Sequence, residues 1–296
     1  LMKCNLLINS KERQEKKEKY RALEELRMYH MKQGDTDASY TPFDKLEVST
    51  MMTIVELSRE LDTEVLYRKL PITDLKFEPK RGVKKIKINV KGEPGDILSL
   101  KTKIDGNAES RCIQTNTGSF PNSISIIMSL DDKNVNLKLF KNKIQITGCK
   151  SIEQTKVTAN LLIEQINKIP KKYDVYIDEG DDKLIAYGHE IGMQNYSFRL
   201  GFRIDRKALH KLITRKSIDF HSSYDPAVNA AVSIKMLDLD ENGKKQYTGS
   251  KKIKCITFRV FESGSVTQSG QNYDKMKLAY DKLRTLVCKY QEELTG

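Results

Sequence analysis

Two segments, one in the middle and one near the end of the chain, carry the same helical pattern of apolar positions. At shared offsets of 0, 3, 7, 10, 14 and 17, the two sets are Ile152, Thr155, Ala159, Leu162, Ile166 and Ile169, and Tyr273, Met276, Tyr280, Leu283, Val287 and Tyr290. This spacing is typical of an amphipathic helix with one buried face. The pattern therefore predicts two long helices in equivalent places of an internal repeat.

Each predicted long helix follows a β-hairpin pattern. The hairpins lie at 134–148 and 255–270, and each ends in Gly. Shorter helical patterns at 58–70 and 204–213 each follow a strand-like run. The predicted repeat unit is thus a strand, a helix, several antiparallel strands and a long helix. The fold class that follows is α+β, with two repeats whose antiparallel sheets join into one curved sheet and carry helices on one face.

The segments outside the repeats are polar. The predicted organisation is a charged N-terminal helix or leader at 1–34, a linker at 35–42, a first repeat at 43–169 with an insertion at about 82–115, a linker at 170–190 and a second repeat at 191–296. The leader has an apolar stripe, Ala22, Leu23, Leu26 and Tyr29, only in its second half. Two interpretations stay open for it: a solvated leader, or an arm that binds a partner or nucleic acid.

Strand alternation assigns polar side chains to the sheet face that the helices leave uncovered. On this face we expect Asn134, Asn136, Lys138, Phe140, Gln145 and Thr147; Thr257, Arg259, Phe261, Thr267 and Ser269; Asn195, Ser197, Arg199 and Arg203; and Asn229, Ala231, Ser233 and Lys235. Five of these residues are cationic and none is acidic. An ordinary solvent-exposed sheet face would carry Asp and Glu as often and would lack Phe. The pattern favours contact with nucleic acid.

Composition narrows the class of protein. The chain has 38% apolar and 31% charged residues, and no apolar run approaches the ~18 residues of a membrane span. A net charge of +12 favours a polyanionic partner. Five dispersed cysteines encode neither a disulfide framework nor a zinc site, and four scattered histidines form no catalytic motif. The acidic loop at 178–182 is interpreted as a solvated linker in preference to a cation site. We expect an intracellular protein that is not an enzyme and has no cofactor or metal.

Four sequence matches carry a resemblance to a known family. They are VNLKLFKNKIQITGCKS at 135–151, VFESGSVTQSG at 260–270, Gln194-Asn195 at the start of a strand, and SSYDP at 222–226. Together, and in their order along the chain, these segments resemble the TATA-binding-protein (TBP) family. The style of divergence is most similar to TBP-like factors of large nucleocytoplasmic DNA viruses. The resemblance implies a monomer with internal pseudo-twofold symmetry, in which a saddle-shaped sheet carries its helices on the convex face.

The resemblance also implies roles for individual residues on the concave face, which lies against the minor groove in this family. Asn195 matches an Asn that contacts base edges, with Thr50 in its place in the first repeat. Phe140 and Phe261 match residues that wedge between base steps. Their partners would be Phe120, or Gly82 in a competing alignment, and Asn229. The complete set of expected DNA-binding residues is Phe120, Phe140, Lys138, Gln145, Thr147, Asn195, Ser197, Arg199, Arg203, Asn229, Arg259, Phe261, Thr267 and Ser269.

The sequence departs from the family where apolar residues meet the minor groove. Lys138, Gln145, Arg259 and Thr267 stand at positions that are Leu or Val in the family. Cationic and hydrogen-bonding side chains suit phosphates, so we expect relaxed or altered TATA specificity.

The expected function is a general transcription-initiation factor that binds double-stranded DNA and recruits a transcription-factor-B-like protein and RNA polymerase. The alternatives are an interaction scaffold without DNA binding and a virion-packaged DNA-compacting protein. The expected location is the host cytoplasm or virion for a viral protein, and the nucleus for a cellular one.

Overall fold

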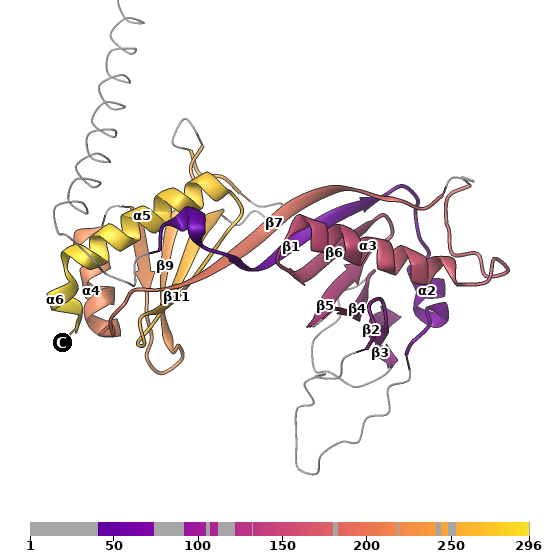
Figure 1. Ribbon diagram of the computed structural model, residues 1–296, viewed down its shortest axis with the longest axis horizontal. Helices are drawn as coiled ribbons and strands as arrows, with labels where there is room; N and C mark the ends of the chain where they lie inside the picture. Colours follow the sequence, from indigo (N-terminus) through magenta and orange to yellow (C-terminus); the bar gives the residue numbers. More distant parts are fainter. Residues whose placement is uncertain are drawn as a thin grey trace, which may run out of the picture. The chain divides into compact units, whose positions relative to one another are not determined.

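The computed structural model describes residues 41–73, 92–104, 107–111, 122–131, 133–179, 183–217, 219–240, 244–247 and 253–295. The predicted leader and Phe120 lie outside these residues. The described chain divides into two compact units (Figure 1). The first unit comprises residues 47–197 and 267–273, and the second comprises the remaining described residues. The repeat boundaries at 43–169 and 191–296 stay a prediction.

The first unit is an antiparallel sheet with helices on one face. Its elements are β1 (Val48–Leu57), α2 (Thr63–Lys69), β2 (Ile97–Ile104), β3 (Asn107–Arg111), β4 (Ile124–Leu130), β5 (Lys133–Leu139), β6 (Lys143–Cys149), α3 (Ile152–Asn167) and most of β7 (Ala186–Arg199). The strand order is β3-β2-β4-β5-β6-β1-β7. The insertion expected at about 82–115 contains β2 and β3, which pair as an antiparallel hairpin.

The second unit has the same succession of a strand, a helix, antiparallel strands and a long helix. Its elements are η1 (Phe43–Lys45), the end of β7, α4 (Arg206–Lys216), β8 (Phe220–Ser223), β9 (Ala231–Leu237), β10 (Cys255–Phe261), β11 (Ser265–Gly270), α5 (Tyr273–Lys289) and α6 (Gln291–Thr295). The strand order is β11-β10-β9-β8. Residues of β11, like those of β7, belong partly to each unit. No helix in the described ranges is long and apolar enough to span a membrane.

Equivalent aspartates begin the short helix of each unit. The carboxylate of Asp62 accepts backbone N–H groups of Glu64 and Val65 at 2.9 and 3.0 Å at the start of α2. Asp205 accepts those of the equivalent residues of α4 at 2.8 and 3.1 Å. Each carboxylate satisfies N–H groups that have no partner within the helix and lies at the positive end of the helix dipole. Both helices therefore begin with the same capping interaction.

The hydrophobic core of each unit lies between its sheet and its long helix. In the first unit, Leu162 and Ile166 of α3 are fully buried in one cluster with Leu137 and Ile146 of the sheet. In the second unit, Tyr280 of α5 contacts the aromatic rings of Phe43 and Phe198 at centroid distances of 5.5 and 4.7 Å. The helices thus cover one face of each sheet (Figure 1). The opposite face of each sheet is called the free face below.

Candidate nucleic-acid interface

The free face of the first unit follows the alternation predicted from sequence. Along β5, Val135, Leu137 and Leu139 are buried, whereas the intervening Asn136 is exposed and Lys138 is half-buried. Strand β6 alternates in the same way, and so does β10 of the second unit. Because successive side chains of a strand point to opposite faces, the polar residues of both hairpins lie on the free faces. This part of the sequence prediction is confirmed.

The strand register arranges the free-face side chains of the first unit in rows across the sheet. One row is Lys101, Ser125, Lys138, Gln145, Ile54 and Glu190, and the adjacent row is Ser99, Ile127, Asn136, Thr147, Met52 and Met193. Neighbouring members are separated by about 4.8 Å, the distance between paired strands. Strands β2 and β5 contribute lysines to these rows, and β1 and β7, at one end of the unit's strand order, contribute mostly apolar side chains.

The apolar region of this face, on β1 and β7, was missed in the sequence. Met52, Ile54 and Met193 are partly exposed on the free face, and Met193 retains 38% of its surface area. The run MMTIVEL in β1 has apolar residues in both phases of the strand alternation, so periodicity alone could not assign its faces. The structure resolves this ambiguity because Met51, Thr53 and Val55 are the buried set.

Two carboxylates also lie on the free face of the first unit, at positions that sequence analysis left unassigned. Glu56 of β1 is opposite Lys143 of β6, and Glu190 of β7 is opposite Ile54. A directly opposite Lys and Glu form a favourable cross-strand pair. The negative charge is confined to β1 and β7, while Lys101 and Lys138 lie on β2 and β5, which β6 separates from β1. The face is therefore cationic toward the β2 side and mixed at β7.

The free face of the second unit is smaller and has no acidic residue among the described positions of β8, β9 and β10. Its cross-strand rows are His221, Lys235 and Thr257; Ser223, Ser233 and Arg259; and Ala231 and Phe261. Lys235 and Arg259 are exposed, and Phe261 is half-buried. The two cations lie in adjacent rows of neighbouring strands, as the sequence predicted for this face.

Asn195, expected to contact base edges, lies on β7 directly opposite Thr50 of β1. These are the two residues that the resemblance assigns to equivalent positions. Within the described part of the chain, the buried Oδ1 atom of Asn195 has no hydrogen-bond partner. Ser49 donates its hydroxyl to the backbone carbonyl of Asn195 at 3.0 Å, which leaves the amide group unengaged by this contact.

Arg203 and Asn229, two of the expected site residues, lie in turns and not on the strands of the free face. Strand β7 ends at Arg199, and Gly201 has a positive φ of 95°, so the alternation that would place Arg203 beside Arg199 is interrupted. Arg203 instead forms an ion pair with Glu262 at 2.6 Å. Asn229 lies in the turn before β9, where its N–H donates to the carbonyl of Asp225. The expectation that Asn229 faces Phe261 is wrong, because the residue opposite Phe261 is Ala231.

Among the other expected residues, those of β7 and β11 lie on strands, whereas Phe140 follows the end of one. Ser197 and Arg199 are exposed on β7, and Thr267 and Ser269 are half-buried on β11. Phe140 is half-buried directly after β5, and its N–H donates to the carbonyl of Lys143 at 2.9 Å. The Phe120 partner and the competing Gly82 both lie outside the described residues.

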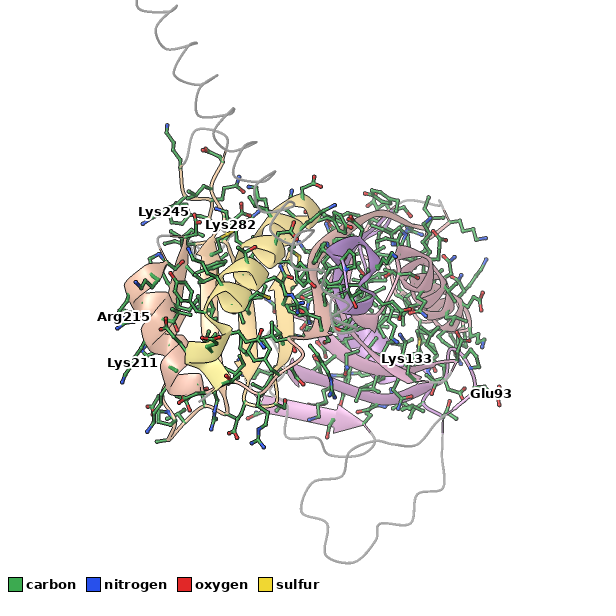
Figure 2. The ribbon with its side chains drawn as sticks, turned by 60° about the vertical axis from the view of Figure 1, so that its left-hand side comes forward. Glu93, Lys133, Lys211, Arg215, Lys245 and Lys282 are labelled. Carbon is green, nitrogen blue, oxygen red and sulfur yellow. The ribbon has the colours of Figure 1, made fainter. Side chains whose placement is uncertain are left out.

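Positive charge is distributed over more than the free faces. Lys211 and Arg215 project from the exposed side of α4 (Figure 2), and Arg215 is 3.9 Å from Glu293. On the free face of the first unit, partial burial lowers the pKa of the Lys101 ammonium group. A group already partly dehydrated in this way would regain favourable electrostatic energy from an anion placed over it. Positive charge alone therefore does not locate a nucleic-acid site. The free faces differ from the other charged surfaces because their side chains form regular cross-strand rows.

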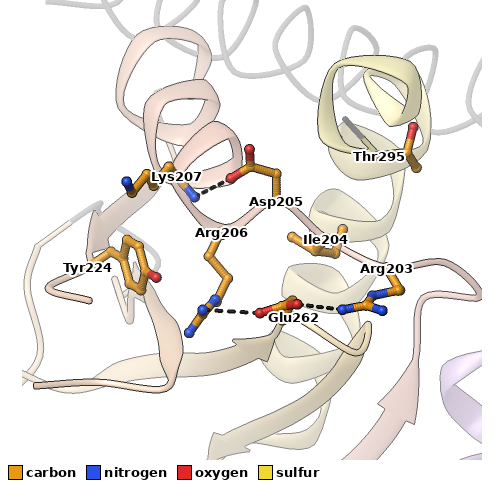
Figure 3. A pocket seen from close by; sticks show the side chains of 8 residues that line it. All are labelled: Arg203, Ile204, Asp205, Arg206, Lys207, Tyr224, Glu262 and Thr295. Atoms are coloured by element: carbon orange, nitrogen blue, oxygen red, sulfur yellow. Dashed lines mark hydrogen bonds and ion pairs between the residues drawn. The ribbon is translucent and has the colours of Figure 1, made fainter. Parts of the chain in front are cut away.

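A pocket of about 320 Å³ lies at the N-terminus of α4, and Figure 3 shows its side chains. Glu262 accepts hydrogen bonds from Arg203 at 2.6 Å and from Arg206 at 3.1 Å. Arg206 also donates to the backbone carbonyl of Ala230 at 2.9 Å and lies over the ring of Tyr224. Because these contacts engage both guanidinium groups, we infer that the side chains of the pocket hold the surrounding turns together.

Comparison with known proteins identifies viral relatives. The chain is 26% identical over 219 residues to a TATA-box-binding protein-like protein of Acanthamoeba polyphaga mimivirus, a match that covers 67% of this chain and 53% of the relative. The chain resembles a viral TBP-like protein. It spans about half the length of that relative. This similarity confirms the resemblance to TBP-like factors of large DNA viruses.

Two further comparisons are more distant. The chain is 26% identical over 242 residues to an uncharacterized protein of Invertebrate iridescent virus 6, covering 69% of this chain and 70% of that protein. The solved structure of Methanococcus jannaschii TBP aligns with a TM-score of 0.44 and 14% identity, over 82% of this chain and 98% of the other. A TM-score at this level defines no common fold, so the architecture rests on the strands and helices themselves. No family model matches the sequence.

Proposed function

We propose that this TBP-like chain binds double-stranded DNA through the free faces of its two units and acts as a transcription-initiation factor. The observation that carries the proposal is the composition of these faces. Rows of lysine, arginine, amide and hydroxyl side chains lie on the side of each sheet away from the helices. In the first unit these rows end in an apolar region on β1 and β7.

The arrangement fits the chemistry of a DNA minor groove. Met52, Ile54 and Met193 offer apolar contact area to base edges, which excludes water without reading a particular sequence. Lys138 of β5 and Lys101 of β2, on the same free face, are suited to phosphates, the groups that dominate affinity. Phe140 and Phe261 at the strand ends would insert between base steps and bend the duplex.

Sequence preference is expected to be weak. Lys138, Gln145, Arg259 and Thr267 occupy places where the family has apolar residues, and their ammonium, guanidinium, amide and hydroxyl groups suit phosphates and sugars as well as bases. The negative charge of Glu56 and Glu190 also opposes close approach of the backbone at β1 and β7. The chain would therefore hold DNA with reduced discrimination between A·T-rich and other sequences.

The proposed role includes protein partners and a place of action. The helical sides of the units would recruit a transcription-factor-B-like protein and RNA polymerase to bound DNA. Support comes from the resemblance to a viral TBP-like protein. The place of action would be the host cytoplasm or the virion, and the chain would act as a non-catalytic monomer.

Duplex binding tests the proposal. The full chain is titrated into fluorescently labelled A·T-rich, G·C-rich and random duplexes, and binding is followed by anisotropy. We expect binding to all three with affinities within about tenfold, the effect of roughly 1.4 kcal/mol. Absence of binding to any duplex would contradict the proposal and favour an interaction scaffold, which Glu56 and Glu190 on the free face would suit. Binding that compacts long DNA but leaves short duplexes straight would favour a DNA-compacting protein.

A further inference from the structure

A β-bulge interrupts the pairing of β7 with β1 in the first unit. Ile54 is opposite Glu190 and Glu56 is opposite Tyr187, so three steps along β7 match two steps along β1. The extra residue lies next to Gly188, whose φ of +60° is typical of a glycine at the first position of a bulge. A bulge shifts the phase of the side-chain alternation. Glu190 and Tyr187 therefore share the free face, although they are an odd number of positions apart.

Burial at the start of β7 agrees with this assignment of faces. Leu184 belongs to the hydrophobic core of the first unit, and Ala186, which is opposite Leu57, packs against that core. The intervening Ile185 and the following Tyr187 retain 52% and 51% of their surface areas. Because successive side chains of an extended chain alternate, both residues project from the free face. They are called the Ile185–Tyr187 pair below.

A cross-strand row connects Tyr187 with Phe140 at the end of β5. Glu56 of β1 is opposite Tyr187 on one side and opposite Lys143 of β6 on the other. The N–H group of Phe140 donates to the carbonyl of Lys143 at 2.9 Å, which continues the pairing of β5 with β6 by one residue. With about 4.8 Å between paired strands, the backbones of the two aromatic residues are about 14 Å apart.

The Ile185–Tyr187 pair extends the apolar region of the free face. Met52, Ile54 and Met193 lie on the same two strands, β1 and β7, which run side by side (Figure 1). The pair adds an exposed aromatic ring and an exposed aliphatic side chain at the end of this region. A duplex that rests on the apolar region and extends toward the start of β7 would therefore meet the pair next.

The charges around the row favour an uncharged contact with DNA at its β7 end. Lys143 lies directly opposite Glu56, and Lys138 lies in the adjacent row on β5, so phosphates are attracted toward the β5 and β6 side. Glu56 and Glu190 repel phosphates near β7. An aromatic ring carries no net charge and does not need a phosphate as its partner. The β7 end is thus suited to contact with the sugars and base edges of a groove.

We propose that the Ile185–Tyr187 pair forms a second apolar contact with the minor groove of bound DNA, in addition to Phe140. This inference rests on the proposed DNA binding and adds the path of the duplex, which follows the row from Phe140 to Tyr187. At 3.4 Å per base step, 14 Å corresponds to about four steps. The ring of Tyr187 packs against sugars and base edges, and its hydroxyl donates to the acceptors that all base pairs present in the minor groove. The contact therefore adds affinity without sequence preference.

A tryptophan reporter tests the contact in the full chain, which contains no native Trp. In Y187W the single indole takes the place of the contact residue, and a short random duplex is added. We expect the duplex to shift the emission to shorter wavelength and to reduce quenching by acrylamide, because it covers the indole. Tyr247 provides the control, since it is 57% exposed and lies in the connection between β9 and β10, where Leu239 accepts a hydrogen bond from Lys275 of α5. In Y247W the duplex should change neither quantity.

The affinity for the same duplex gives a second measurement. Y187A should weaken binding roughly tenfold, which is within the range for the loss of one aromatic contact with a nucleotide. It should leave the dependence of log K on log[salt] unchanged, because no charge is removed, whereas K138A should lower this slope by about one. Y187F keeps the ring and should retain most of the affinity.

The outcomes separate this inference from the proposed function. If the wild type binds duplexes but Y187A binds equally well and the Y187W indole stays exposed, the inference is overturned and DNA binding stands. Equal responses of Y187W and Y247W would also overturn it. A shift of Y187W emission with protein concentration in the absence of DNA would overturn it as well, because a second copy would then cover the pair. Absence of duplex binding by the wild type would contradict both the inference and the proposed function.

Discussion

Arg206 is expected to contribute far more to the stability of the second unit than Arg203, although both bind the same carboxylate. Arg203 is 80% exposed and has one ion pair with Glu262, whereas Arg206 is 26% exposed and bridges Glu262 and the carbonyl of Ala230. The two arginines thus form a matched pair at one site (Figure 3). Replacing each with Ala compares the effect of losing a surface ion pair with the effect of losing a half-buried bridge between two turns.

The expected magnitudes follow from the contacts. An exposed ion pair contributes about 0–1 kcal/mol, so Arg203→Ala should have an effect in that range. Arg206→Ala removes a charged hydrogen bond to a carbonyl, worth about 1.5–3 kcal/mol, and a cation–π contact with Tyr224. Because these contributions overlap, we expect a total loss of about 2–3 kcal/mol. Arg206→Lys should recover little of it, since an ammonium group cannot bridge two acceptors in the planar geometry of a guanidinium.

The assay is native-state hydrogen exchange of the β9 and β10 amides, which reports the free energy of opening this unit separately from the first. Arg206→Ala should accelerate exchange of these amides much more than Arg203→Ala does. Equal effects of the two substitutions would refute the reasoning, because the contacts with Ala230 and Tyr224 would then contribute nothing. An unchanged free energy in Arg206→Ala would refute it as well.

Three further outcomes are expected. Gly264→Ala should lower the free energy of unfolding by about 1–3 kcal/mol in urea titrations, because Gly264 has a φ of +77° and a Cβ atom there would lie 2.0 Å from a carbonyl oxygen. Burial, together with the charge of Lys156, lowers the pKa of His189, so the stability it contributes should be complete above its unfolded pKa of about 6.5 and decrease as the pH falls through the lower folded pKa. His189→Gln should remove this dependence, measured by urea unfolding on both sides of that pH. Phe140→Ala should reduce bending of a short duplex, measured by end-to-end fluorescence transfer, more than Phe261→Ala, because only a methyl side chain lies opposite Phe261.

The assignment of faces could be predicted from sequence wherever the two phases of a strand differ in polarity. In β5 and β10 the apolar and polar residues alternate cleanly, and the buried set is the one expected. In β1 both phases are apolar, so the free-face positions of Met52 and Ile54 followed only from the packing of α3 and the sheet. The helix pattern was more informative because a buried stripe repeated at identical offsets fixes both the type of element and its orientation.

Positions after turns could not be predicted in the same way. Arg203 was assigned by continuing the alternation of β7, but Gly201 ends the strand by adopting a positive φ. Asn229 was assigned opposite Phe261, yet the turn before β9 shifts the register so that Ala231 takes that place. Register depends on turn length and on long-range strand pairing, which a local pattern does not contain.

The salt dependence of duplex binding in three variants tests most directly whether the free faces contact DNA. Lys235 and Arg259 lie on the free face of the second unit, and Lys211 is an exposed lysine on α4 of the same unit. Each is changed to Ala, and the binding constant is measured by anisotropy over a range of salt concentrations. If the free face holds phosphates, K235A and R259A should each lower the slope of log K against log[salt] by about one, and K211A should leave it unchanged. Unchanged slopes in K235A and R259A, or an equal change in K211A, would contradict DNA binding by this face.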